Sequence, residues 1–141
     1  MDEKMNSPKQ HIMIVDDEPS VTRLVRLTLE HTGEYEVREE NHPDHALAAA
    51  REFRPDLILL DVLMPGLDGG QLASQFKASP HFAKVPIVFL TAAVTHAEVT
   101  SHGGLVGGER FLAKPVDIPE LVECLHEILG KGGPAGAQAH A

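Results

Sequence analysis

Four apolar segments of this chain each end in a polar side chain that suits phosphate chemistry. The most informative is 56–60, which closes on Asp61 and leads into the turn sequence 62–66. The other three segments are 12–15, 86–90 and 111–113, and they end in Asp16 and Asp17, in Thr91 and in Lys114 respectively. In open α/β sheets the carboxyl ends of the strands share one edge, where ligands bind. We therefore expect an acid pair, a lone acid, a hydroxyl and an ammonium group to meet there.

This set of groups suits a divalent cation beside a phosphoryl group. Carboxylates held within about 4–6 Å of one another raise the pKa of at least one of them unless a cation neutralises their charge. Mg²⁺ commonly takes one or two carboxylates plus water and phosphate oxygens. The ammonium of Lys114 would neutralise phosphate as a point charge, and the hydroxyl of Thr91 would donate a hydrogen bond to it. Each residue alone has a structural alternative, such as a turn or cap for Asp16 or Asp17, but their joint occurrence at strand ends favours function.

Apolar strand patterns alternate with amphipathic helix patterns along the chain. Strands are predicted at residues 10–15, 35–40, 56–60, 86–90 and 109–113, and helices at 19–31, 43–53, 68–79 and 117–129. In the first helix the spacing places Val21, Leu24, Val25 and Thr28 on the inward face. The strand 35–40 alternates as an edge strand does, whereas the other strands are apolar enough to be covered on both faces. Right-handed crossovers then predict an α/β, three-layer sandwich around a five-stranded parallel sheet.

The segment between Thr91 and Phe111 gives the weakest pattern. A fifth helical stretch, fourth in chain order, is expected over 95–102 and should be short or mobile, because glycines follow at 103, 104, 107 and 108. Glycine within a helix costs about 0.5–1 kcal/mol relative to alanine. We expect residues 1–9 to be a disordered lead, 10–130 to form one domain and 131–141 to be a flexible tail rich in glycine, proline and alanine.

Composition excludes several classes of protein. The chain has 141 residues, 12 basic and 21 acidic side chains and a net charge of −9, so it lacks the basic stripe of a nucleic-acid-binding protein. No apolar run approaches the length of about 18 residues that would predict a membrane span, and the start of the chain does not resemble a secretory signal. The single cysteine, Cys124, fits a reducing compartment. A cytoplasmic protein that binds neither nucleic acid nor membranes is expected.

Nine histidines raise the question of a transition-metal site. His42 and His45 have a ligand-like spacing, but the histidines are scattered over predicted helices, loops and the tail and have no cysteine partner. Zinc sites normally assemble three or four nitrogen or sulfur ligands. The histidines are therefore not expected to bind a metal.

The strand-end residues also carry a family resemblance. Asp16 and Asp17, Asp61 with 64–66 and 68–69, Thr91 with Ala92, and the segment 111–115 together resemble a receiver domain of two-component response regulators, over about residues 10–130. The resemblance implies a flavodoxin-like fold with strand order 2-1-3-4-5. It also implies a cis peptide bond between Lys114 and Pro115.

The family's site residues can be carried over to matching positions. The resemblance implies that Asp61 is the phosphoacceptor, that Mg²⁺ is the cofactor, and that Asp61 is also one of the metal ligands. Asp17 would bind the ion directly and Asp16 largely through water. The backbone carbonyl of Leu63 would complete the protein's share of the metal site.

The remaining carried-over roles concern the phosphoryl group and the switch. Lys114 would pair with the phosphoryl group, and Thr91 would swing inward to bond it. Phe111 would follow Thr91 as the aromatic switch residue. Since Phe111 lacks a hydroxyl group, its change of position would act by packing alone.

The expected function is a phosphorylation-controlled signalling switch rather than an enzyme, acting on no substrate except its own aspartate. A sensor histidine kinase or a histidine phosphotransfer protein would supply the phosphoryl group, and an unknown protein would receive the signal. With eleven residues after position 130, we expect a stand-alone regulator. One alternative is a receiver module excised from a longer regulator or hybrid kinase. The other is a small Mg²⁺-dependent phosphatase with an aspartyl nucleophile, but such enzymes need an acid where this chain has Leu63.

Overall fold

A computed structural model describes residues 8–64, 67–92, 105–106 and 109–130 of the chain. Its elements in chain order are β1 (Gln10–Val15), α2 (Pro19–His31), β2 (Tyr35–Glu40), the 3₁₀ turn η1 (Pro43–His45), α3 (Ala46–Phe53), β3 (Leu57–Asp61), β4 (Leu63–Met64), β5 (Leu67–Asp68), α4 (Gly69–Ala78), β6 (Ile87–Thr91), β7 (Leu105–Val106), β8 (Glu109–Ala113) and α6 (Ile118–Leu129).

The main sheet confirms the predicted topology. Its order is β2-β1-β3-β6-β8-β7, and the first five strands are parallel neighbours. These five strands reproduce the expected order 2-1-3-4-5. The sheet also contains a strand that the sequence did not predict, because β7 pairs antiparallel with β8 at the far edge.

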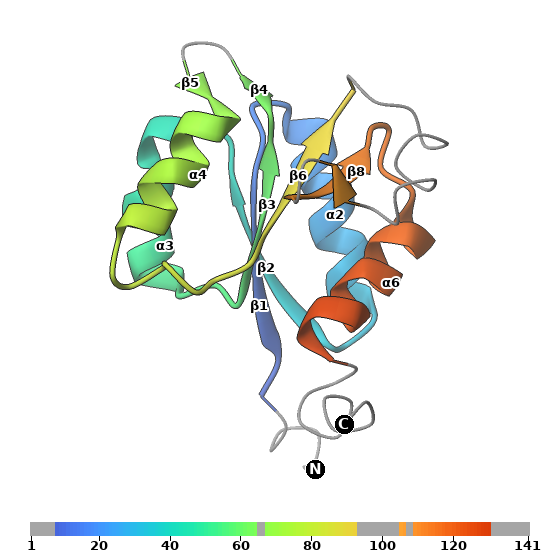
Figure 1. Cartoon of the computed structure of the whole chain (residues 1–141). Coiled ribbons are helices and arrows are strands. Elements are labelled where there is room, and N and C mark those ends of the chain that lie inside the picture. Colours follow the sequence, from blue (N-terminus) through green and yellow to red (C-terminus); the bar gives the residue numbers. More distant parts are fainter. Residues whose placement is uncertain (1–7, 65–66, 93–104, 107–108, 131–141) are drawn as a thin grey trace.

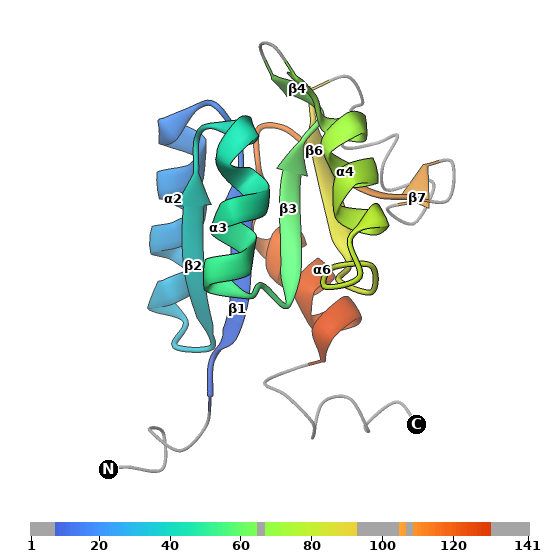
Figure 2. The ribbon, with the colours of Figure 1, turned by 90° about the vertical axis from the view of Figure 1, so that its left-hand side faces the viewer.

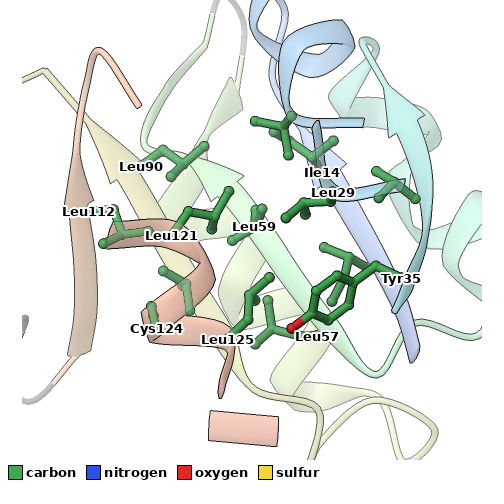
Figure 3. Packing of buried hydrophobic residues seen from close by; sticks show 14 residues of the cluster. Ile14, Leu29, Tyr35, Leu57, Leu59, Leu90, Leu112, Leu121, Cys124 and Leu125 are labelled. Atoms are coloured by element: carbon green, nitrogen blue, oxygen red, sulfur yellow. The ribbon is translucent and has the colours of Figure 1, made fainter. Parts of the chain in front are cut away.

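Helices cover both faces of the sheet, as Figure 1 shows, with α3 and α4 on one side and α2 and α6 on the other. Alternate residues of a strand point to opposite faces, so Ile12 and Ile14 of β1 join the cluster under α2 and α6. Met13 and Val15 join the cluster under α3 and α4. The two apolar clusters fix the strands from both sides, and Figure 3 shows the packing of the first around Leu59.

The buried face of α2 differs from the prediction: of the four residues predicted to face inward only Val25 is fully buried, while Val21 and Thr28 are partly buried. Thr22, Val25 and Leu29 form its buried stripe, whereas Leu24 is 49% exposed. Residues one apart on a helix lie about 100° apart around its axis, so Val25 in the stripe turns Leu24 toward solvent. The spacing predicted the helix correctly, but the face that packs on the sheet is rotated from the predicted one.

Other departures are short elements with weak sequence patterns. The second predicted helix begins as η1, whose turn is closed by a 2.9 Å hydrogen bond from the His45 N–H to the His42 carbonyl, and continues as α3. The ribbon β4–β5 stands above the carboxyl end of β3 (Figure 1) and was not predicted. The helix expected over 95–102 lies outside the described residues. No helix in the described part of the chain is long and apolar enough to cross a membrane.

Candidate functional site

The three predicted acids meet at the carboxyl edge of the sheet. Val15 of β1 pairs with Leu60 of β3, so the residues that follow them, Asp16 and Asp61, lie side by side. One carboxylate oxygen from each of Asp16, Asp17 and Asp61 can be chosen so that all lie within 4.8 Å of one another. This geometry places three negative charges in a volume that suits a hard divalent cation.

Thr91 and Lys114 complete the same edge through two further strands. Thr91 ends β6 and pairs with Ala113 of β8, and the Lys114 N–H donates a 2.9 Å hydrogen bond to the Thr91 carbonyl. This backbone contact fixes where the lysine side chain leaves the sheet. Its Nζ lies 2.9 Å from Asp16 Oδ2 and 3.6 Å from Asp61 Oδ1. The predicted lysine therefore faces the acids.

These groups surround an open pocket of about 240 Å³. Its lining comes from the β1–α2 loop and from the ends of β3, β6 and β8, and consists of Asp17, Glu18, Asp61, Thr91, Ala92 and Lys114. Asp61 and Thr91 are buried at its floor, while Lys114 keeps 15% of its side chain exposed. The pocket is thus open to solvent, with the Asp61 carboxylate buried below its mouth.

Burial dominates the electrostatics of Asp16. Its carboxylate is fully buried, and this desolvation raises the pKa of Asp16, although the Glu18 N–H at 2.9 Å and the ammonium of Lys114 act in the opposite direction. Partial burial also opposes the charge on Lys114, but its carboxylate neighbours outweigh it and raise the pKa of Lys114. The ion pair therefore stabilises the lysine cation but does not fully offset the burial of Asp16.

A divalent cation fits this arrangement. Asp16 Oδ2 is buried and accepts no well-directed hydrogen bond within the described part of the chain, despite its closeness to the ammonium. Mg²⁺ takes all-oxygen ligands of this kind. A bound ion would satisfy Oδ2 and lower the repulsion among the acids. Leu63 lies in β4, directly after the acid edge, and the role of its carbonyl stays a prediction.

Two residues at the site were not assigned roles from the sequence. The carboxylate of Glu18 lies 3.1 Å from Lys114 Nζ, so the lysine is shared among three acids. Gly69, at the start of α4, packs against the end of β3, where a Cβ would overlap the Asp61 carbonyl oxygen. Its glycine identity is the available sequence signal, because only glycine permits such a backbone approach.

The predicted switch residues occupy adjacent strands. Phe111 of β8 is partly buried and stacks on Phe89 of β6, with ring centroids 5.1 Å apart. Thr91 lies two residues beyond Phe89 on the same strand. The peptide bond between Lys114 and Pro115 is cis, which confirms that prediction.

Comparison with known proteins agrees with this geometry. The family model described as the response regulator receiver domain matches residues 12–126. The chain is 36% identical over 129 residues to the phosphate regulon transcriptional regulatory protein PhoB of Pseudomonas aeruginosa, covering 91% of this chain and 55% of that protein. It is 31% identical over 118 residues to protein PilH of the same organism, covering 84% and 96% respectively. Thus the chain spans about half the length of the first curated relatives it matches.

Solved structures give the same result. The chemotaxis protein CheY4 of Vibrio cholerae superimposes with a TM-score of 0.73 at 30% identity, covering 86% of this chain and all of that one. The receiver domain of the sensor histidine kinase PA1611 of Pseudomonas aeruginosa matches with a TM-score of 0.71 at 28% identity, covering 88% of this chain and all of that one. That structure has a magnesium ion coordinated in its active-site cleft.

Receiver domains are signalling modules that histidine kinases phosphorylate, and they do not in general act as enzymes on other substrates. One assignment follows from the fold, from the three carboxylates beside Lys114, and from the family match over most of the chain. This chain belongs to the response regulator receiver domain family and is a phosphorylation-controlled switch of two-component signalling.

Proposed function

We propose that Asp61 accepts a phosphoryl group from a phosphohistidine of a sensor kinase or phosphotransfer protein, with Mg²⁺ bound by Asp16, Asp17 and the Leu63 carbonyl. The observation that supports this most directly is the convergence of the three carboxylates within 4.8 Å beside the ammonium of Lys114. Asp61 is the natural acceptor because its carboxylate forms part of the pocket wall, while that of Asp16 is fully buried.

In the reaction, one carboxylate oxygen of Asp61 attacks phosphorus. The bond from phosphorus to the donor nitrogen breaks, and its electron pair stays on the imidazole. A bound Mg²⁺ supplies charge neutralisation on the transferring oxygens, which is the main requirement of phosphoryl transfer. Lys114, already 3.6 Å from Asp61 Oδ1, moves to a phosphoryl oxygen and exchanges a carboxylate partner for the new anion.

The phosphorylated state would be read through Thr91 and Phe111. The Thr91 hydroxyl donates to a phosphoryl oxygen, and Phe111 repacks against the space that Thr91 leaves. Phosphorylation can shift this equilibrium only by the difference in its interaction free energy with the two arrangements. The output is binding to a downstream protein or transfer of the phosphoryl group to a histidine phosphotransfer protein.

The cellular setting is part of the same proposal. Cys124 is buried and is the single cysteine of the chain, which fits a reducing compartment. We therefore place the domain in the cytoplasm. A receiver module within a longer regulator is a second candidate, because the chain spans about half of several of its relatives. The chemistry at Asp61 would be the same in both cases.

The test is incubation of the purified chain with acetyl phosphate and Mg²⁺, followed by intact mass measurement. We expect a gain of one phosphoryl group that is abolished in Asp61→Asn and by chelation of the metal. Asp44→Asn, which replaces an exposed acid, is the matched control and should be phosphorylated normally. Turnover of phosphomonoesters without a stable mass gain would instead support a phosphatase and contradict the proposal.

A further inference from the structure

A second group of metal-ligating side chains lies at the end of β2. Glu40 closes the strand, His42 precedes the turn η1 and His45 is the last residue of that turn. One ligand atom from each can be chosen so that all three lie within 4.8 Å of one another. Glu40 precedes His42 by two residues, and the turn after β2 directs its carboxylate toward both imidazoles.

Glu40 is the most constrained of the three. It is a charged side chain with only 8% of its surface exposed. Its Oε2 accepts a 3.0 Å hydrogen bond from the His42 N–H and lies 3.8 Å from His42 Nδ1. Within the described residues no lysine or arginine forms an ion pair with it. A buried carboxylate without a cation is unfavourable, and a metal ion at this position would supply one.

The two imidazoles add nitrogen ligands to the carboxylate oxygen of Glu40. The His42 and His45 rings are exposed and face each other at a centroid distance of 5.3 Å and an interplanar angle of 39°. Two imidazole nitrogens and one carboxylate are typical ligands of Zn²⁺, whereas Mg²⁺ selects oxygen ligands. The Glu40 carboxylate is already oriented by a backbone N–H, as metal ligands usually are by outer hydrogen bonds.

We propose that Glu40, His42 and His45 form a binding site for a divalent transition metal ion of the Zn²⁺ type, with the fourth position left to water. The site is separate from the acidic pocket and does not rest on the proposed phosphoryl transfer. It nevertheless borders the same loop, since Glu40 pairs with Val15, and the Asp16 N–H donates to the Glu40 carbonyl at 3.1 Å. Asn41, between the ligands, donates to the Asp16 carbonyl at 2.8 Å.

Figure 2 shows how this placement arises. The arrowhead of β2 points toward the same end of the molecule as that of β3, and the chain then crosses that end to enter α3. A metal ion held at η1 would tie the end of an edge strand to the start of α3. Because a ligand that binds only the folded state stabilises it, the ion should also raise resistance to unfolding.

The experiment is calorimetric titration of the full chain with ZnCl₂ in the presence of excess Mg²⁺, added to compete with Zn²⁺ for the acidic pocket. We expect one Zn²⁺ per chain, with affinity reduced by about tenfold or more in Glu40→Gln and in His45→Ala. His31→Ala, which removes another exposed histidine, is the control and should leave the affinity unchanged. Zn²⁺ should raise the melting temperature of the wild type but not of His45→Ala.

Two outcomes would overturn the site. One is wild-type Zn²⁺ affinity in both Glu40→Gln and His45→Ala, which would place the ion elsewhere. The other is loss of Zn²⁺ binding in Asp61→Asn with these two variants unaffected, which would assign the ion to the acidic pocket. Melting temperatures without metal show that each variant is folded. Failure of phosphorylation by acetyl phosphate would not bear on this result, because the titration needs no phosphoryl donor.

Discussion

Replacing Lys114 with methionine should destabilise the protein when no divalent cation is present, and Mg²⁺ should reverse part of the loss. Methionine keeps much of the length and apolar stem of the lysine but removes its charge. The lysine Nζ lies 2.9 Å from Asp16 Oδ2, 3.1 Å from Glu18 Oε1 and 3.6 Å from Asp61 Oδ1. Its removal therefore takes away the ammonium that faces two buried acids.

The size of the effect follows from burial. Removing one partner of a buried ion pair costs about 3–5 kcal/mol. Lys114 retains 15% side-chain exposure, whereas Asp16 has none, so the lower end of that range applies. We expect the free energy of unfolding to fall by about 3 kcal/mol. For a domain of this size the melting temperature should fall by about 10 °C.

Mg²⁺ should narrow the difference between the variant and the wild type. An ion that binds only the folded state stabilises it by about 2.7 kcal/mol at a hundred times its Kd. The variant no longer places a competing ammonium beside the acids, so it should bind Mg²⁺ at least about tenfold more tightly. This gain corresponds to about 1.4 kcal/mol.

Urea unfolding followed by circular dichroism, with EDTA or with saturating Mg²⁺, measures both effects. Lys84→Met replaces an exposed lysine that has no ion pair within the described residues and is the matched control. If Lys114→Met loses less than about 0.5 kcal/mol in EDTA, a typical value for surface substitutions, the lysine is not the cation that balances the buried acids. An equal loss with and without Mg²⁺ would show that the ion does not bind beside Lys114.

Four further outcomes are expected. Burial raises the folded-state pKa of Asp16 above its unfolded value of 3.8. In EDTA, its contribution to the free energy of unfolding should therefore grow as pH falls toward 3.8 and be lost as pH rises through the folded-state pKa. Asp16→Asn should flatten this part of the stability profile, which urea unfolding measures. Gly69→Ala should cost about 1–3 kcal/mol and slow acetyl phosphate labelling of Asp61, because its Cβ would overlap the Asp61 carbonyl. Tyr35→Phe should raise the free energy of unfolding by about 1 kcal/mol, since the buried hydroxyl has no hydrogen-bond partner within the described residues; a comparable decrease would contradict this. Burial raises the pKa of Cys124 to about 11, so iodoacetamide should alkylate it, as read by intact mass, only when the protein is unfolded.

The strands and the convergence of the acids could be predicted because both depend on simple patterns. A parallel strand covered on two faces is a short apolar run, and the runs before Asp16, Asp61 and Thr91 have this form. Once strands are parallel, their carboxyl ends share an edge. The composition of that edge can then be taken from the residue after each run, without knowledge of any side-chain contact.

Features that depend on packing or on a single turn could not be predicted in this way. The placement of Leu24 depends on which side of α2 meets the sheet, and neighbouring leucines satisfy the spacing almost equally well. The two-residue strands of β4, β5 and β7 are too short to show periodicity. The contact of Glu18 with Lys114 depends on the approach of β8 to the β1–α2 loop, which the local sequence does not contain. Glu40 is close to His42 in the sequence, but its direction depends on the turn after β2.

The acidic edge is best understood as a balance between burial and charge. The fold buries Asp16 fully and raises its pKa, which opposes folding at neutral pH. Lys114 offsets part of this cost, but a phosphoryl group on Asp61 would compete for the same ammonium. When the lysine turns to that group, Asp16 loses its nearest cation, and a bound metal ion would take over the neutralisation of its carboxylate. The same contact geometry that holds the resting state together would therefore make the phosphorylated state depend on bound Mg²⁺.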